Sequence, residues 1–214
     1  MMCAKGQPGL RERKKMQTRS ALISAALELC DQQGFDATTV EQIADSVDIS
    51  PRTFNRYFAT KEDVVLGPIE ELVTAVVAAL DAQPKTGNEL DALCAAHVQV
   101  FEEAASQDPP SPLFEQFMVM NRIVAASPAV RARSVEMGEW KTQAIRSKVA
   151  QRMGLADDDM RVRVVMSTYG ALMQLAMDQW DMSGDADSGV VMLGCAKSIK
   201  ATYATFRETV PGSH

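Results

Sequence analysis

Apolar side chains recur at every third or fourth position along most of this chain, and this spacing predicts helices rather than strands. A first helix is expected from Leu10 to Gln33. Gly34 is its expected C-terminal stop, because glycine readily adopts the left-handed conformation that ends many helices. The apolar face of this helix consists of Leu22, Ile23, Ala26, Leu27 and Cys30. It is expected to brace the two short helices that follow.

A long helix is expected from Lys61 to about Ala82, with Pro68 bending or breaking it early. Further helices are expected in the rest of the chain, separated by loops rich in proline, glycine and acidic residues. They cover residues 89–106, 113–126, 128–153, 157–182 and 188–208. The fold class is therefore predicted to be all-α.

The stretch after the first helix carries the local signals of two short helices joined by a tight turn. Thr39 and Gln42 have the spacing of a capping box, in which each residue satisfies a free backbone N–H of the other. Asp48 lies where the chain must turn, and aspartate tolerates the left-handed region better than most residues. Ser50 followed by Pro51 is typical of an N-cap with proline at the first helical position.

The second short helix, expected from Pro51 to Phe58, has a polar outer face. Its residues Arg52, Asn55 and Arg56 can bond to DNA, since arginine pairs bidentately with guanine and asparagine with adenine. Two helices, a tight turn and a basic outer face suit a recognition helix that enters the major groove. The alternative is that each of these side chains is an ordinary solvated surface group.

Taken together, residues 19–63 resemble the DNA-binding domain of the TetR family of transcriptional regulators. The matching residues are Arg19, Ala25, Ala26, Gly34, Phe35, Thr38, Thr39, Val40, Ile43, Ala44, Ser50, Thr53, Phe54, Tyr57, Phe58, Lys61 and Glu62. Two positions depart from the pattern of the family. Asp48 stands in the turn where glycine is usual, and Asn55 stands where an aromatic residue is common.

The resemblance implies which residues contact DNA. Arg52, Thr53 and Asn55 are expected to contact bases, with a phosphate contact as the alternative for Asn55. Arg56, Tyr57, Lys61 and Thr39, together with the N-terminal arm, are expected to contact phosphates. The complete predicted DNA-binding set is Arg19, Thr39, Ser50, Arg52, Thr53, Asn55, Arg56, Tyr57 and Lys61.

The net charge of −6 is unusual for a DNA-binding protein until its distribution along the chain is considered. Six of the first 20 residues are Lys or Arg and one is acidic, whereas the acidic excess lies after residue 66. A basic arm at one end of the protein suits contacts with the phosphate backbone. The alternative is that this arm is only a solubilising tail.

The sequence gives no support for a metal, a cofactor or a membrane segment. Cys3, Cys30, Cys94 and Cys195 lie far apart without a C-x-x-C pair, so neither a zinc site nor a disulfide framework is expected. No apolar run is long enough to cross a bilayer, and the N-terminus lacks the apolar core of a secretory signal. A cytoplasmic protein associated with the nucleoid is therefore expected.

The last two expected helices carry apolar faces broader than a single hairpin could cover. These faces consist of Val162, Val165, Met166, Tyr169, Leu172, Met173, Met177, Trp180, Val191, Leu193, Cys195, Ile199, Tyr203 and Phe206. Because helical recognition modules commonly bind DNA as two-fold dimers, the two helices are expected to form a four-helix bundle with those of a second subunit. The resembled family uses this arrangement. The alternative is an internal core alone.

Methionine is abundant, with 13 residues, and most of them lie after residue 117. Flexible thioethers adapt to irregular apolar surfaces, so a cavity for an apolar ligand is expected among the middle helices. His97, on an otherwise apolar stripe, is its expected polar anchor. The predicted ligand-binding set is His97, Phe101, Phe117, Met120, Trp140, Met166, Tyr169 and Met173. The alternative is that these side chains are ordinary core residues.

The pairs Glu139–Trp140 and Gln179–Trp180, with the segment 152–154 between them, are similar to the C-terminal domain of a TetR subgroup common in actinobacteria. Some members of that subgroup respond to long-chain acyl-CoA or other lipophilic molecules. The resemblance therefore makes a long apolar molecule the first expectation for the ligand.

The sequence thus predicts a helix-turn-helix DNA-binding domain at residues 10–60 and a larger helical ligand-binding and dimerisation domain at 61–208, between tails at 1–9 and 209–214. The expected function is a repressor that a small apolar ligand releases from a palindromic operator. The alternatives are a constitutive regulator, a small-molecule-binding protein and a helical enzyme. An enzyme is disfavoured because the chain has no Glu-x-x-His pair, glycine-rich phosphate loop or nucleophile elbow.

Overall fold

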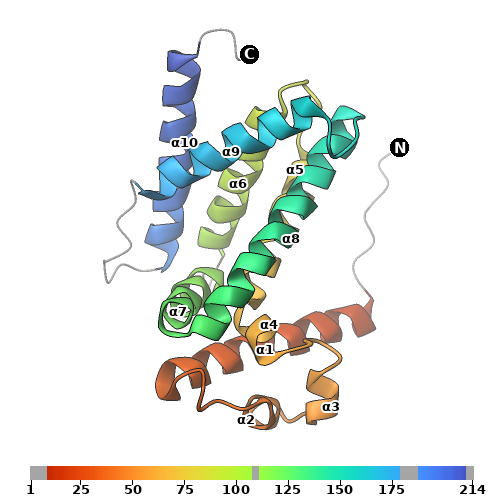
Figure 1. Ribbon diagram of the computed structural model, residues 1–214, viewed down its shortest axis with the longest axis vertical. Coiled ribbons are helices and arrows are strands. Elements are labelled where there is room, and N and C mark those ends of the chain that lie inside the picture. The colour runs from red at the N-terminus through yellow and green to blue at the C-terminus, as the bar shows by residue number, and fades with distance from the viewer. Residues whose placement is uncertain (1–8, 108–110, 179–187, 211–214) are drawn as a thin grey trace. The chain divides into compact units, whose positions relative to one another are not determined.

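The computed structural model describes residues 9–107, 111–178 and 188–210, and every regular element within these ranges is an α-helix (Figure 1). The helices are α1 Leu10–Gln33, α2 Val40–Asp45, α3 Pro51–Phe54, α4 Lys61–Val65, α5 Gly67–Ala82, α6 Glu89–Ala105, α7 Leu113–Ala126, α8 Pro128–Met153, α9 Met160–Asp178 and α10 Ser188–Thr209. The predicted all-α class is confirmed.

The short helix α3 is tighter and shorter than predicted. The N–H of Asn55 donates to the carbonyl four residues back, whereas the N–H groups of Arg56 and Tyr57 donate to carbonyls three residues back, at 3.1 and 2.8 Å. Such bonds belong to a 3₁₀-like turn, which continues the coil with a smaller radius. The predicted end of the helix at Phe58 is therefore corrected to Phe54.

The start of α9 also differs from the prediction. The helix begins at Met160 rather than at Asp157, because the Asp159 carboxylate accepts the backbone N–H of Arg161 at 2.9 Å and caps the helix. The predicted end near Met182 lies outside the described residues.

The predicted break near Pro68 is present. Helix α4 ends at Val65 and α5 begins at Gly67, with Leu66 between them. A Cβ atom on Gly67 would lie 2.5 Å from Cδ1 of Ile23 in α1, so only glycine allows this close approach.

The chain divides into two compact units. The first consists of Met1–Pro68 together with Gln116–Val135, and the second contains the remainder. This grouping places most of α7 and the start of α8 with the N-terminal helices. The division predicted from the sequence, into residues 10–60 and 61–208, instead assigns both helices to the second domain.

Three polar pairs attach α7 and the start of α8 to the other helices of the first unit. The pairs are Gln116–Ser24 at 3.0 Å, Arg122–Asp31 at 2.9 Å and Arg133–Asp63 at 2.8 Å. The Asp63 carboxylate also accepts the backbone N–H of Thr60 at 3.2 Å, as part of the capping box of α4. Asp63 thus belongs to the capping box of α4 and also binds α8.

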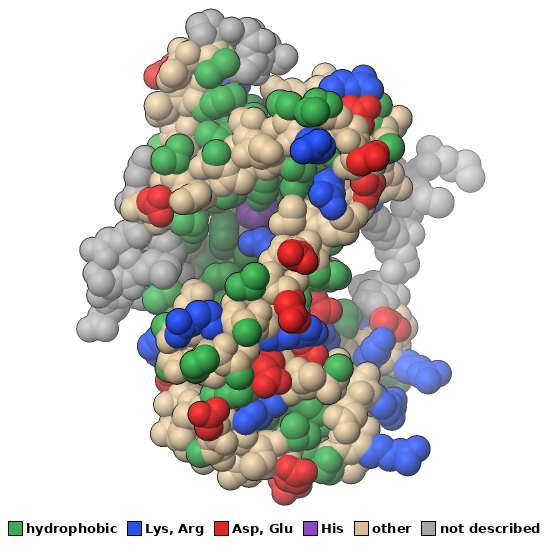
Figure 2. Space-filling view, viewed as in Figure 1, with side chains coloured by type: hydrophobic (Ala, Val, Ile, Leu, Met, Phe, Trp, Pro, Cys, Tyr) green, Lys and Arg blue, Asp and Glu red, His purple; other side chains and the backbone are tan. Residues whose placement is uncertain are grey.

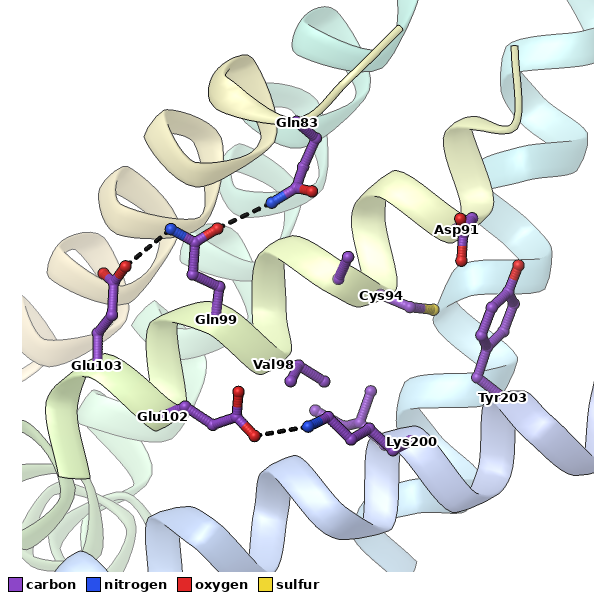
Figure 3. Close-up of a pocket in the computed structure, with 11 residues that line it drawn as sticks. Gln83, Asp91, Cys94, Val98, Gln99, Glu102, Glu103, Lys200 and Tyr203 are labelled. Carbon is purple, nitrogen blue, oxygen red and sulfur yellow. Dashed lines mark hydrogen bonds and ion pairs between the residues drawn. The ribbon is translucent and has the colours of Figure 1, made fainter. Parts of the chain in front are cut away.

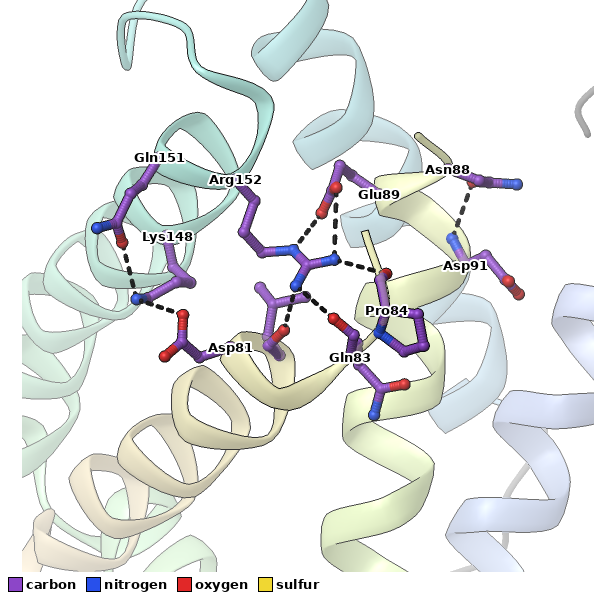
Figure 4. Close-up of polar contacts among 10 residues, drawn as sticks. Asp81, Gln83, Pro84, Asn88, Glu89, Asp91, Lys148, Gln151 and Arg152 are labelled. Atoms are coloured by element: carbon purple, nitrogen blue, oxygen red, sulfur yellow. Dashed lines mark hydrogen bonds and ion pairs between the residues drawn. The ribbon is translucent and has the colours of Figure 1, made fainter. Parts of the chain in front are cut away.

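A buried ion pair organises one end of the second unit (Figure 4). The Arg152 side chain is 1% exposed and pairs with Glu89, at the start of α6, over 2.6 Å. Its guanidinium also donates to the carbonyl oxygens of Leu80, Gln83 and Pro84 at 2.7, 2.9 and 3.0 Å. One side chain of α8 therefore holds the end of α5, the loop after it and the start of α6.

Candidate DNA interface and internal polar cluster

The N-terminus of α2 is fixed by the predicted capping box. The N–H of Gln42 donates to the Thr39 hydroxyl at 3.2 Å, and the Gln42 side chain accepts the N–H of Thr39 at 2.9 Å. The Gln33 amide at the end of α1 donates to the same Gln42 oxygen at 3.1 Å. The start of α2 is thus joined to the end of α1, and the Thr39 hydroxyl, although on an exposed residue, already accepts one bond.

The turn between α2 and α3 also follows its sequence signals. Asp48 has a positive φ of 54°, the left-handed conformation expected for a turn residue. The Ser50 hydroxyl accepts the N–H of Thr53 at 3.2 Å and lies 3.0 Å from the Thr53 hydroxyl. These contacts define where α3 begins.

Helix α3 has one buried face and one exposed face. Phe54 is fully buried and Phe58, just after the helix, is 4% exposed, so both belong to the core of the first unit. Arg52, Asn55 and Arg56 are exposed. The predicted recognition surface is therefore open to a partner, with an aromatic core directly behind it.

A basic groove lies beside this surface. It has a volume of about 900 Å³ and joins the N-terminal end of α1 to the turn after α3. We call it the arm groove; it is lined by Leu10, Arg11, Glu12, Lys14, Lys15, Thr18, Arg56 and Tyr57. Figure 2 shows Lys and Arg side chains standing out from the surface at this end of α1. Four cations against one carboxylate make the groove suitable for an anionic polymer.

Lys61 has a different environment from the one predicted for a phosphate contact. Its ammonium donates to the carbonyl oxygens of Phe35 and Thr38, both at 2.6 Å, and lies 4.0 Å from the centre of the Phe35 ring. Two of its three N–H donors thus fix the loop between α1 and α2. Arg19 is similarly placed against protein, with its guanidinium carbon 4.4 Å from the centre of the Phe58 ring.

Three of the predicted ligand-binding residues meet in the second unit. The His97 and Tyr169 rings lie 5.3 Å apart, and the His97 and Phe101 rings lie 6.4 Å apart. The Tyr169 hydroxyl is 2.6 Å from Nδ1 and 2.9 Å from Nε2 of His97, and both residues are buried. A neutral imidazole has one donor and one acceptor nitrogen, so the direction of this hydrogen bond depends on the tautomer of His97.

The other predicted ligand-binding residues are more dispersed. Met166 and Met173 are half-buried on α9, and Trp140 is 44% exposed on α8. Phe117 and Met120 belong to the first compact unit, whereas the histidine and tyrosine belong to the second. The structure therefore groups only part of the predicted set.

A lysine that the sequence analysis did not select belongs to the same cluster. Burial, with the nearby Lys141 ammonium, lowers the pKa of His97 to about 3. Burial also lowers the pKa of Lys141 and raises the pKa of Tyr169 well above its usual value. We call His97, Lys141 and Tyr169 the internal polar cluster. Only its position directly after Trp140, a predicted ligand-binding residue, could have indicated from the sequence that Lys141 belongs to this cluster. No pattern of spacing marks a buried lysine.

A separate open pocket of about 480 Å³ lies between α5, α6 and α10 (Figure 3). None of the predicted ligand-binding residues lines it. Its walls are linked by polar contacts, including the ion pair of Lys200 with Glu102 at 2.6 Å and the Gln83–Gln99 bond at 2.8 Å. Most of its charged groups already have protein partners, so it offers fewer free groups to a ligand.

Among the residues that the structure describes, no three His, Cys, Asp or Glu side chains are grouped to hold a metal ion. Cys30, Cys94 and Cys195 are free and buried, and burial raises the pKa of each thiol, to about 12 for Cys94 and Cys195. No helix in the described part of the chain is long and apolar enough to span a bilayer.

Two sequence families match the chain. Residues 22–67 match the family described as bacterial regulatory proteins, tetR family, and residues 88–203 match the family described as MftR C-terminal domain. The chain is also 36% identical over 181 residues to the HTH-type transcriptional regulator TcmR of Streptomyces glaucescens. That match covers 84% of this chain and 80% of TcmR.

Solved structures are similar to the chain at low sequence identity. A transcriptional regulator of Pseudomonas aeruginosa PAO1 matches with a TM-score of 0.52 at 18% identity, over 91% of this chain and 92% of that one. A TetR-family regulator of Streptomyces coelicolor A3 matches with a TM-score of 0.47 at 19% identity, over 94% and 99% of the two chains.

The helix-turn-helix and the matches of both halves of the chain agree with one another. The second family match alone covers more than half of the chain, and the similarity to TcmR extends across both units. The chain belongs to the TetR family of bacterial transcriptional regulators.

Proposed function

We propose that this TetR-family regulator is a repressor that binds a palindromic operator as a homodimer and leaves it when a small apolar ligand binds. It acts in the cytoplasm, at the nucleoid. The observation that carries the proposal is the exposure of Arg52 on α3 and of Asn55 directly after it, beside the arm groove. Groups that can distinguish bases thus stand next to cations that can hold the backbone.

The proposed contacts divide into two kinds. Arg52 and Asn55 contact base edges, and the Thr53 methyl packs on a thymine methyl. Arg56 and Tyr57 contact phosphates together with the lysines and arginine of the arm groove. The exposed and half-buried states of these five side chains allow such contacts without rearrangement of the core.

The remaining residues of the predicted DNA-binding set act by positioning α3. Ser50 caps it, Thr39 caps α2, and Lys61 holds the loop between α1 and α2 through two carbonyl oxygens. Arg19 packs on Phe58, at the end of the recognition segment. Their proposed effect on DNA affinity is therefore mainly indirect.

Dimerisation is proposed to use α9 and α10. Large apolar side chains on these helices remain exposed in the single chain, and burial of such groups is the usual driving force of subunit association. They are Met160, Val164, Leu175, Met177 and Leu193, with exposed fractions between 36% and 64%. Pairing of the two helices with their symmetry mates forms the proposed four-helix bundle.

The ligand is proposed to bind in the second unit, at the internal polar cluster and those apolar residues of the predicted set that belong to this unit, namely Phe101, Trp140, Met166 and Met173. A long-chain acyl-CoA or a similar lipophilic molecule is the first candidate. The resemblance of the C-terminal half to the actinobacterial subgroup, some of whose members respond to such molecules, supports this class.

The signal from the ligand is proposed to reach the DNA-binding helices through α8 and α4. Helix α8 is continuous from Pro128 to Met153 and contributes residues to both units. Its Arg133 pairs with Asp63, which caps α4. A ligand that favours one position of α8 would move α4. This movement would change the separation of the two recognition helices of the dimer. That separation must match DNA half-sites about 34 Å apart, or a multiple of this distance.

Selection of the protein on randomised DNA duplexes tests the proposal. The expected product is a two-fold symmetric site whose half-sites are spaced by whole helical turns. Addition of a palmitoyl-CoA probe should then release the protein from that site and raise its melting temperature, because a ligand specific for the folded state stabilises it. Selection of no common sequence would contradict the DNA-binding part. Stabilisation without release would contradict the repressor mechanism.

A further inference from the structure

Lys141 is a partly buried cation to which the described residues supply no counter-ion. It lies on α8 beside His97, and burial lowers its pKa. Among the residues that the structure describes, it takes part in no hydrogen bond or ion pair. Removing an ammonium from water without a partner is unfavourable, because its charge is then buried without compensation.

The same unit shows how this chain buries a cation that has only a structural role. Arg152 pairs with Glu89 and donates to three backbone carbonyl oxygens, so its charge and its donors are satisfied (Figure 4). Lys141 has none of these partners. A structural role in the core explains why Arg152 is buried, but it does not explain why Lys141 is.

His97, the described residue that interacts with Lys141, carries no negative charge. His97 is held neutral, since burial lowers its pKa, and Tyr169 keeps its proton, since burial raises its pKa. His97, the one histidine among the described residues, is buried, whereas Lys141 is only partly buried. The cluster therefore combines one cation, a neutral ring and a phenol, and its cation is the member that solvent can reach.

We propose that Lys141, beside His97, binds a single anionic group carried by an apolar effector. The inference rests on the proposed function, in which the second unit binds such an effector. An anionic oxygen supplies the counter-ion that none of the described residues gives Lys141. Phe101, Met166 and Met173 are available for the apolar body.

The ammonium of a lysine acts as a compact point charge, which suits one anionic group rather than a flat bidentate contact. A carboxylate and a phosphate both meet this requirement. An uncharged alcohol of the same length does not, because it leaves the charge of Lys141 uncompensated.

Two fluorescent probes with the same ring system test the subsite in the full-length protein. 8-Anilinonaphthalene-1-sulfonate carries an anionic group, and N-phenyl-1-naphthylamine lacks it. The variants are Lys141→Met, which keeps the length of the side chain, and Lys85→Met, which removes an exposed lysine from the loop before α6. Melting curves of each variant accompany the titrations.

The expected result is that Lys141→Met weakens binding of the anionic probe by about tenfold or more and leaves binding of the neutral probe within about twofold. Lys85→Met should change neither. Lys141→Met should also melt at a higher temperature than the wild type, because it removes an unpaired charge. Three results for Lys141→Met would overturn the proposal. They are an equal loss of affinity for both probes, an unchanged affinity for the anionic probe, and a lower melting temperature together with loss of binding of both probes.

Displacement of the bound anionic probe identifies the anion. Displacement by octanoate assigns a carboxylate, displacement by octyl phosphate assigns a phosphate, and equal displacement by 1-octanol contradicts an anionic subsite. The titrations contain no DNA. They therefore succeed or fail independently of operator binding, which the duplex selection tests separately.

Discussion

Arg152 holds one carboxylate and three carbonyl oxygens in the interior of the second unit. Its replacement by methionine would leave the Glu89 carboxylate buried without a partner. We expect Arg152→Met to lower the free energy of unfolding by about 3–5 kcal/mol, measured by urea denaturation. Arg152→Lys should restore little of the loss, because an ammonium cannot reach the same acceptors in one plane.

The control for this prediction is the exposed pair of Lys200 with Glu102, in which Lys200 is 57% exposed. Solvent screens such a pair, so Lys200→Met should cost about 1 kcal/mol or less. Equal losses for Arg152→Met and Lys200→Met would contradict the structural role of the buried pair.

His97 makes stability depend on pH with a defined sign. Its folded pKa of about 3 lies below the ordinary value of 6.5, so between these values the unfolded state binds a proton that the folded state rejects. Stability should therefore be unaffected by His97 above pH 6.5 and fall as the pH decreases toward 3. Urea denaturation at pH 7.5 and pH 5 should show this loss in the wild type, and a smaller one in His97→Gln.

Proton NMR can follow the same residue directly. The chain contains two histidines, so a His214→Gln variant leaves His97 as the only one. The C2 proton of His97 should keep its chemical shift from pH 8 to pH 5. A titration midpoint near 6.5 would show that the ring is solvated rather than held neutral.

At the scale of elements, the helix-turn-helix was predictable because its signals are local. The caps at Thr39, Ser50 and Thr60 each involve a residue three positions ahead, so the sequence alone shows both partners. The pair Arg133–Asp63 was not predictable, because 70 residues separate its partners and only the packing of α8 brings them together. The same limit explains why Lys141 was missed.

Lys61 illustrates how an element can depend on one side chain. Its two bonds to carbonyl oxygens connect α4 with the loop between α1 and α2. We expect Lys61→Met to lower the free energy of unfolding by about 1–3 kcal/mol, measured by thermal or urea denaturation, because two buried carbonyl groups lose a charged donor. DNA affinity should fall for every sequence alike.

A lysine of the arm groove provides the matched control. Lys14 is exposed, so Lys14→Met should leave stability within about 0.5 kcal/mol and reduce the slope of log affinity against log salt concentration by about one. If Lys61→Met were as stable as the wild type and changed only the salt slope, Lys61 would be a phosphate contact after all.

For the whole molecule, the order of the helices in the described ranges followed from apolar spacing, whereas the grouping of the helices into units did not. Residues 116–135 are an ordinary amphipathic stretch in the sequence, yet Gln116 and Arg122 bond to α1 and place it in the first unit. Nothing in the local pattern distinguishes a helix that packs on one unit from a helix that packs on the other.

The proposed dimer gives a prediction at this scale. Leu175 is 52% exposed on α9, and a glutamate there would place charge in the proposed four-helix bundle. Leu175→Glu should sediment as a monomer in analytical ultracentrifugation and lose operator affinity, because the two half-sites are then bound independently. Val135→Glu, which replaces a side chain 67% exposed on α8, should remain dimeric. A dimeric Leu175→Glu variant would place the interface elsewhere.

The central claim is that α3 distinguishes bases while the adjoining cations hold the backbone. Fluorescence anisotropy tests it on the selected operator and on a shuffled duplex, over a range of salt concentrations, with Arg52→Ala and Arg56→Ala. Arg52→Ala should lose about 1–3 kcal/mol on the operator and little on the shuffled duplex, whereas Arg56→Ala should lose affinity for both and reduce the salt slope by about one. Equal losses of Arg52→Ala on the two duplexes, or a wild-type protein that binds neither duplex at low salt, would contradict the account.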